Sequence, residues 1–202
     1  MRRAAFPALL LVAACSSARP LVAARLATST TISSTTTTTS TTVPPTTTTL
    51  DPGTLPQTTA RPSGSDPAFL ARMQLLWDAV VSGDVPAALP AFFPEAAYLQ
   101  VKAIANPDAD WHQRLVRLYD GDIAALHARL SGRPAALVSV AVPDAAATWV
   151  LPGAEYNKGS YWRVYGTVVH YTVGGQAASF PVQSLISWRG QWYVVHLVTP
   201  PR

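Results

Sequence analysis

Histidine is the side chain best suited to acid–base catalysis or metal binding near neutral pH, and this sequence contains four. His170 and His196 lie in C-terminal segments that alternate like strands, whereas His112 and His127 lie in a segment with helical spacing. None of the HExxH, CxxC, GxSxG or P-loop patterns is present. The sequence therefore predicts neither a metal site nor a bound cofactor.

The two strand histidines can be placed by the register of the strands. If Gly174-Gly175 and Arg189-Gly190 are two-residue hairpin turns, Gln183 lies opposite His196 on the neighbouring strand. His170 and His196 then share one face of the sheet. They are two strands apart and offset along the strand direction, so about 16 Å separates the two residues. This separation is too long for both to bind one ion.

A small constellation around His196 is the remaining candidate site. His196, beside Gln183 and opposite the gap left by Gly166, would form the polar end of a cavity. Asp78 on the first helix would supply a carboxylate, and His196 or Asp78 would act as a general base. The ligand-binding residues would be Trp77, Tyr98, Gln183 and His196. In the alternative interpretation His196 is a hydrogen-bonded sheet histidine and Asp78 a solvated helix residue, because lone titratable groups are usually structural.

The only cysteine, Cys15, follows a short apolar segment near the N-terminus. Arg2 and Arg3 precede this segment, which covers the 11 residues 4–14. A helix that spans a bilayer needs about 20 apolar residues, so the segment suits the h-region of an export signal instead. A disulfide within the chain is excluded because Cys15 has no partner.

The residues Val12-Ala13-Ala14-Cys15 resemble the lipobox of bacterial lipoproteins. The resemblance implies that residues 1–14 are a signal peptide and that the Cys15 thiol receives a diacylglycerol. It also implies a lipid anchor at the outer face of the bacterial cell membrane, in the cell envelope. The alternative is an ordinary signal peptide cut after Ala18, which would remove Cys15.

Residues 15–65 are predicted to form a disordered Ser/Thr/Pro-rich tether. Residues 28–59 contain 17 threonines and almost no large apolar side chain. Such a composition cannot bury enough surface to offset the entropy of ordering the chain. It is typical of glycosylated stalks and equally of a bare spacer. Either would hold a domain clear of the lipid headgroups.

The formal net charge of +4 belongs to the leader and tether. Residues 66–202 contain ten Lys or Arg and ten Asp or Glu, so this part of the chain is neutral. It also lacks a basic stripe with interleaved aromatic residues. These features argue against nucleic acid as a partner.

Residues 66–202 are predicted to form one α+β domain. Helical spacing predicts helices from Asp66 to Ser82, from 84 to about 93, and over 110–130 with a break near 120–122. Residues 95–104 fit a helix or a strand. From Ala136 onward β-branched alternation predicts strands, the last three of which form an antiparallel meander. The expected fold has N-terminal helices packed on a curved, cone-like antiparallel sheet.

The segments FLARMQLLWDAVVSGDVPAALPAFFPEAAY and SLISWRGQWYVVHL resemble the nuclear transport factor 2-like (SnoaL-like, cystatin-like) superfamily. The resemblance implies an α+β cone in which a bent sheet wraps a long helix. The resemblance extends over residues 66–202 and rests on the order of the helices and strands. The helical segment 105–135 departs from the family's pattern. The family contains dehydratases, isomerases, ligand binders and interaction modules, so the resemblance does not choose a function.

The aromatic residues favour binding over catalysis. All six tryptophans lie within residues 66–202, and both faces of the meander carry bulky apolar side chains. One face would be covered by helices. The other face would be a homodimer interface, or a docking surface for an envelope protein or for a small apolar or sugar-like ligand. Alternatively, this face would be packed under the helical segment. We therefore expect a cell-envelope lipoprotein with a non-catalytic binding or interaction domain. The alternative is a dehydratase- or isomerase-like enzyme that uses a pocket His or Asp as general base.

Overall fold

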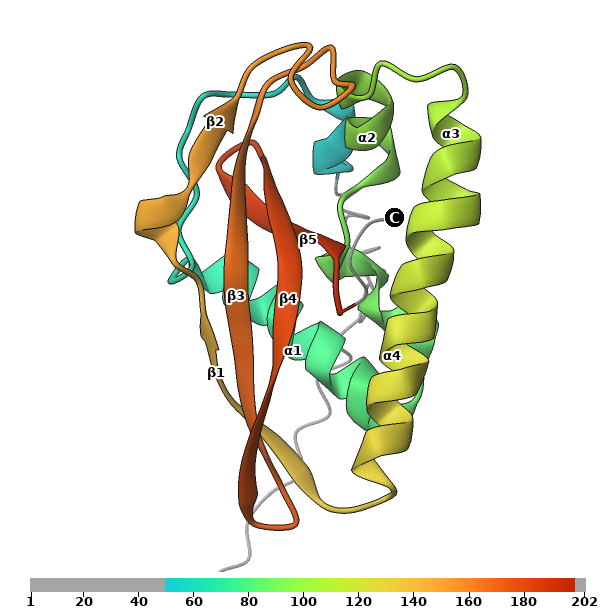
Figure 1. The fold of residues 1–202 in the computed structure, drawn as a ribbon, viewed down its shortest axis with the longest axis vertical. Coiled ribbons are helices and arrows are strands. Elements are labelled where there is room, and N and C mark those ends of the chain that lie inside the picture. The colour runs from blue at the N-terminus through green and yellow to red at the C-terminus, as the bar shows by residue number, and fades with distance from the viewer. Residues whose placement is uncertain (1–49, 199–202) are drawn as a thin grey trace, which may run out of the picture. The chain divides into compact units, whose positions relative to one another are not determined.

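The structure is a computed structural model that describes residues 50–198. Cys15, the apolar segment before it and the tether up to residue 49 lie outside this range. Helices pack on a curved antiparallel sheet, so the predicted α+β class is confirmed (Figure 1). No helix within residues 50–198 combines the length and the apolar character that are needed to cross a membrane.

The helical elements precede most of the sheet in the chain. They are the 3₁₀ helices η1 (Pro52–Thr54), η2 (Val85–Ala91) and η4 (Asp144–Ala146), the α-helices α1 (Pro67–Ser82), α2 (Glu95–Val101), α3 (Pro107–Asp110) and α4 (Arg117–Leu130), and the π-helical segment η3 (Trp111–Val116). Helix α1 begins as predicted, because the Asp66 carboxylate accepts hydrogen bonds from the N–H groups of Ala68 and Phe69. It ends at Gly83, whose φ of 78° suits glycine.

Two helix predictions are corrected by the structure. Residues 85–91 form a 3₁₀ helix with Pro90 inside it, because proline cannot donate the hydrogen bonds of an α-helix. The predicted break near residues 120–122 is wrong, since α4 continues through Gly121. The buried Asp122 carboxylate accepts a hydrogen bond of 2.8 Å from the N–H of Val198, and this tertiary contact fixes the turn that the local sequence disfavours.

The sheet contains β1 (Ala135–Ala141), β2 (Thr148–Val150), β3 (Tyr161–Val173), β4 (Gln176–Trp188) and β5 (Gln191–His196). Its order is β1-β3-β4-β5, and β2 pairs with the start of β3. The predicted meander is confirmed, with two-residue turns at Gly174-Gly175 and Arg189-Gly190. His170 lies opposite Ser179, as the first turn predicts.

The predicted register fails at the end of β5. Leu185 pairs with Val194 as expected, but the next residue on β4, Ser184, pairs with His196. Val195 is therefore an extra residue, a β-bulge, and it moves His196 onto the other face of the sheet. The predicted pairing of Gln183 with His196 is wrong, because the Gln183 N–H donates to the carbonyl of Leu197 at 2.8 Å.

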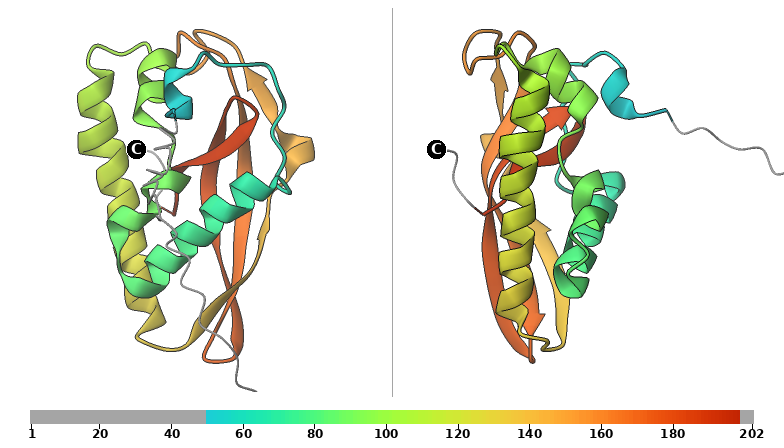
Figure 2. Two further views of the ribbon diagram at one scale, coloured as in Figure 1. Left: turned by 180° about the vertical axis from the view of Figure 1, so that it is seen from behind. Right: turned by 90° about the vertical axis from the view of Figure 1, so that its right-hand side faces the viewer.

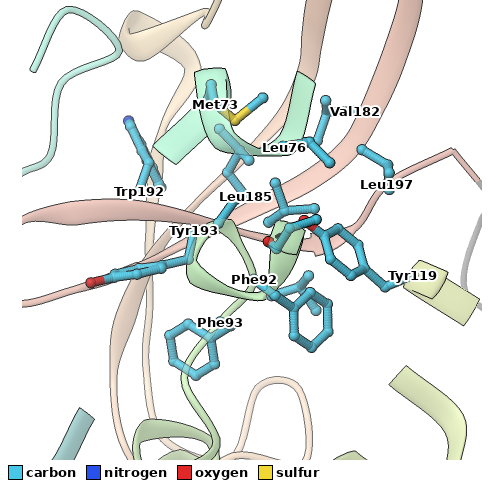
Figure 3. Packing of buried hydrophobic residues seen from close by; sticks show 14 of the residues in the cluster. Met73, Leu76, Phe92, Phe93, Tyr119, Val182, Leu185, Trp192, Tyr193 and Leu197 are labelled. Carbon is cyan, nitrogen blue, oxygen red and sulfur yellow. Dashed lines mark hydrogen bonds between the residues drawn. The ribbon is translucent and has the colours of Figure 1, made fainter. Parts of the chain in front are cut away.

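The helices and the sheet enclose one apolar core. Helix α1 crosses β3 and β4 diagonally, and α4 runs along the strands at the side of the sheet (Figures 1 and 2). Met73 and Leu76 of α1 meet Leu185 of β4 in this core, while Phe92 packs on Tyr119 with ring centroids 4.6 Å apart (Figure 3). Helix α1 and the sheet thus bury their apolar side chains in a common core.

Residues 51–65, here called the strap, lie along the sheet. The indole N–H of Trp188 donates to the carbonyl of Pro52 at 2.8 Å, and that of Trp162 donates to the carbonyl of Thr59 at 3.1 Å. The Arg61 guanidinium stacks 5.1 Å from the centroid of the Trp162 ring. The prediction that the disordered tether extends to residue 65 is therefore wrong for residues 51–65, because tryptophans more than a hundred positions away supply their partners.

Candidate functional site

Of the four residues predicted to line a cavity, the structure brings two together. Tyr98 and His196 both line a cavity of about 80 Å³ between α2 and the sheet. Charged side chains share this lining, namely Lys102, Glu155 and Arg163. We refer to this space as the polar cavity.

Burial and nearby cations disfavour the protonated form of His196 in this cavity. Its Nδ1 lies 2.9 Å from the hydroxyl oxygen of Ser184. Burial, followed by the positive charges of Arg114 and Lys102, lowers the pKa of His196 to about 4 against the opposing effect of Asp122. Within residues 50–198 no hydrogen bond joins His196 to a carboxylate, and its Nε2 makes none. This arrangement is not the His–acid pair that the catalytic interpretation needs.

The other polar groups near Tyr98 are paired with one another. The Tyr98 hydroxyl donates to the Asp110 carboxylate, which also accepts two hydrogen bonds of 2.6 Å from Arg114. Burial, followed by the bond to Asp110, raises the pKa of Tyr98, and Arg114 lowers that of Asp110. Across the cavity Glu155 accepts a hydrogen bond from Tyr161 at 2.8 Å and pairs with Arg163.

The remaining predicted site residues lie elsewhere. Trp77 is buried with its ring centroid 5.0 Å from that of Tyr171. Asp78 is exposed and accepts a hydrogen bond of 2.8 Å from the amide of Gln74, as expected for a solvated helix residue. Gln183 is not part of the lining of the polar cavity. The predicted constellation of His196 with Trp77, Asp78 and Gln183 is therefore not assembled.

A larger space, the aromatic groove, lies beside the start of α2, where Pro94 and Glu95 belong to its lining. Its volume is about 480 Å³. Its lining combines aromatic rings and prolines with three charged side chains, and consists of Asp51, Pro52, Arg72, Leu89, Pro90, Phe92, Phe93, Pro94, Glu95, Trp111 and Tyr193. The groove thus has apolar walls with a few charged groups among them.

The rings of the aromatic groove are held in place by contacts with one another. The indole N–H of Trp111 donates to the carbonyl of Phe93 at 3.0 Å, and the Phe93 ring meets the Tyr193 ring edge-on at 6.1 Å. Figure 3 shows Phe93 and Tyr193 next to each other at the edge of the core. A ligand would therefore meet walls that are already in place, which limits the entropy cost of binding.

Arg72 is the only cation in the lining of the aromatic groove. Its guanidinium lies 4.4 Å from the centroid of the Tyr193 ring and donates to Gln191 at 2.9 Å and to the carbonyl of Trp192 at 3.0 Å. Its Nε is buried and has no hydrogen-bond partner within residues 50–198. Burial lowers the pKa of Arg72, while Tyr193 and Asp66 act in the opposite direction.

Sequence reasoning missed the aromatic groove because its residues come from segments far apart in the chain. The strap supplies Asp51, α1 supplies Arg72 and β5 supplies Tyr193. The one local signal was the run Leu89-Pro90-Ala91-Phe92-Phe93-Pro94, in which large apolar side chains stand between prolines that end regular helices.

Comparison of the chain with models of protein families, with curated proteins and with solved structures found no match.

Proposed function

We propose that this chain is a cell-envelope lipoprotein, anchored through Cys15, whose folded domain binds a ligand in the aromatic groove without catalysing a reaction. The observation that carries the proposal is the groove itself, with a volume of about 480 Å³ and largely apolar walls. Spaces of about 300–1,000 Å³ with apolar and aromatic linings are the usual binding sites of small molecules.

The polar cavity gives weaker support to the dehydratase- or isomerase-like alternative. A volume of about 80 Å³ is enough for a few water molecules, each of which occupies about 30 Å³ in the liquid. A general base must also reach the proton that it removes, and the Nδ1 of His196 is already engaged with Ser184. Binding in the groove is therefore the function that these contacts favour.

The lining indicates the chemical class of the ligand. Phe93, Trp111 and Tyr193 offer apolar contact to a flat ring system. Arg72, the one cation in this lining, favours an acidic or hydrogen-bond-accepting group at one end of such a ligand. We therefore propose an apolar, ring-containing molecule that carries an acidic or carbonyl group, such as an aromatic carboxylate or sulfonate.

A fluorescence titration with 1-anilinonaphthalene-8-sulfonate tests the proposal, because this probe combines aromatic rings with an anionic group. Leu89 lines the groove and is 44% exposed, so Leu89→Glu places a charge in the groove without disturbing the core. We expect this variant to weaken binding of the probe by about tenfold, since a carboxylate that is desolvated by the probe is unfavourable. The matched control is Leu75→Glu, at a position 43% exposed on α1 and outside the groove, with less than about a twofold effect.

Binding in the groove would be contradicted if both variants weakened probe binding equally, or if neither Leu89→Glu nor Leu75→Glu weakened it.

The lipid anchor is tested separately by growing cells with a radiolabelled fatty acid. We expect label on the wild-type chain and none on Cys15→Ser. Label that persists on the Cys15→Ser chain would exclude Cys15 as the site of lipidation.

A further inference from the structure

Three side chains from two helical regions converge at the surface beside the aromatic groove. Glu95 belongs to the first turn of α2, Asp108 to α3, and His112 to the π-helical segment η3. One oxygen or nitrogen atom of each lies within 4.8 Å of the corresponding atoms of the other two. We propose that these three residues bind a divalent first-row transition-metal ion of the zinc type.

The distances fit ligands arranged around one ion. The Nε2 of His112 lies 3.3 Å from Oε1 of Glu95 and 3.8 Å from Oδ1 of Asp108. Ligand atoms in a tetrahedral zinc site lie 2.0–2.1 Å from the metal, which places them about 3.3–3.4 Å from one another. The His112–Glu95 distance already fits a zinc ion at normal bond lengths, whereas Asp108 has to move closer to His112.

Hydrogen bonds from His112 to Glu95 and Asp108 explain the position of these three side chains less well than a bound metal ion does. A neutral imidazole carries one N–H, so its Nε2 cannot donate fully to two carboxylates at once. The contact with Asp108 at 3.8 Å is longer than a hydrogen bond. The contact with Glu95 at 3.3 Å is at the long end of the hydrogen-bond range. A shared cation would satisfy all three atoms together.

The donor set indicates which ions are suitable. Imidazole nitrogen with carboxylate oxygens suits Zn²⁺ and its first-row neighbours, whereas Ca²⁺ and Mg²⁺ prefer ligands that are all oxygen. The spacing of four between Asp108 and His112 places both on one side of the helical segment, and Glu95 completes the set from α2. Three protein ligands leave a fourth position for water or for another ligand atom.

The site lies against the aromatic groove through two of its residues. Glu95 lines the groove directly, and the His112 ring lies 4.7 Å from the ring of Trp111, which also lines it. Metal binding does not depend on the groove ligand, so it is testable with the ion alone. The nearby indole provides a spectroscopic signal, because a paramagnetic ion such as Cu²⁺ quenches fluorescence at short range.

The experiment is an isothermal calorimetric titration of the full chain with ZnCl₂. The chain carries Cys15→Ser, because a thiolate would bind zinc on its own. His112→Gln is the test variant and His170→Gln, at an exposed histidine of β3, is the matched control. We expect one strong zinc site per chain, at least about tenfold weaker in His112→Gln and unchanged within about twofold in His170→Gln. Circular dichroism of each variant checks that it is folded.

Two further measurements give the assignment separate tests. Glu95→Gln and Asp108→Asn are each expected to weaken zinc binding by about tenfold. Cu²⁺ is expected to quench tryptophan fluorescence in the wild-type background and to quench it less in His112→Gln. Zinc affinity that is equal in wild type and His112→Gln would overturn the proposal. The proposal would also be overturned if Ca²⁺ or Mg²⁺ bound as tightly as zinc and this binding did not depend on His112.

Discussion

Ser184 lies directly opposite His196 in the sheet, and its hydroxyl oxygen is 2.9 Å from the Nδ1 of that histidine. The β-bulge at Val195 creates this pairing, because it turns His196 away from Gln183 and toward the polar cavity. Depending on the imidazole tautomer, either group donates the hydrogen bond. Burial and the positive charges of Arg114 and Lys102 lower the pKa of this histidine.

Stability in acid is expected to depend on His196. Its pKa is about 4 in the folded chain and about 6.5 when exposed, so the unfolded state binds the proton more strongly. The fold therefore loses stability as the pH falls from about 6.5 to about 4, and His196 has no pH-dependent effect above that window. Allowing for solvent screening, we expect a loss on the order of 2 kcal/mol in the free energy of unfolding.

The measurement is urea denaturation at pH 7.5 and 4.5 on wild type, His196→Gln and the control His170→Gln. His196→Gln should lose less stability on acidification than the other two proteins. Carboxylates with lowered pKa values, such as Asp66 and Asp110, act in all three proteins and cancel from the comparison. An equal loss in all three would show that His196 does not carry the effect.

The strap is expected to be part of the cooperative fold. Deleting residues 1–65 removes the hydrogen-bond acceptors of the Trp188 and Trp162 indoles, together with Gln57, whose amide donates to the carbonyl of Ser187 at 2.9 Å. Each such bond contributes about 0.5–1.5 kcal/mol, so the loss of all three should cost about 1.5–4.5 kcal/mol. Chains that begin at residue 50 and at residue 66 are compared by urea denaturation. Equal stability of the two would contradict this role.

Asp144 is expected to link the strap to the sheet. Its Oδ1 accepts a hydrogen bond of 3.0 Å from the indole of Trp192, and its Oδ2 accepts one of 2.8 Å from the N–H of Gly64. Asp144→Ala leaves the buried indole without its partner, which should cost about 1–3 kcal/mol of unfolding free energy. Asp84→Ala is the control, because this exposed carboxylate makes no capping hydrogen bond. A loss below about 0.5 kcal/mol for Asp144→Ala would refute the link.

The sheet was the part of the fold that the sequence predicted best. The Gly174-Gly175 turn, together with β-branched alternation, determines the β3–β4 register over its whole length. The register of β5 could not be followed beyond Val194, because a bulge is set by tertiary packing and leaves no mark in the residue pattern. That one extra residue decides which cavity His196 enters.

The strap and the aromatic groove were missed for a different reason. Composition alone places residues 51–65 with the threonine-rich tether, and the contacts that hold them come from Trp162 and Trp188, far along the chain. The groove is likewise built from the strap, α1, the segment around Phe93 and β5. Only the folded chain brings these segments together, whereas the pair Asp108 and His112, four residues apart, was visible in the sequence.

The most direct test of binding in the aromatic groove is the NMR spectrum of the indole N–H groups of ¹⁵N-labelled chain, recorded with and without 1-anilinonaphthalene-8-sulfonate. Single Trp→Phe variants assign the signals. We expect the Trp111 signal to move, because this indole lies in the wall of the groove, while those of Trp149 and Trp162 on the sheet stay in place. Movement of the Trp149 and Trp162 signals with a stationary Trp111 signal would place the ligand on the sheet and contradict binding in the groove.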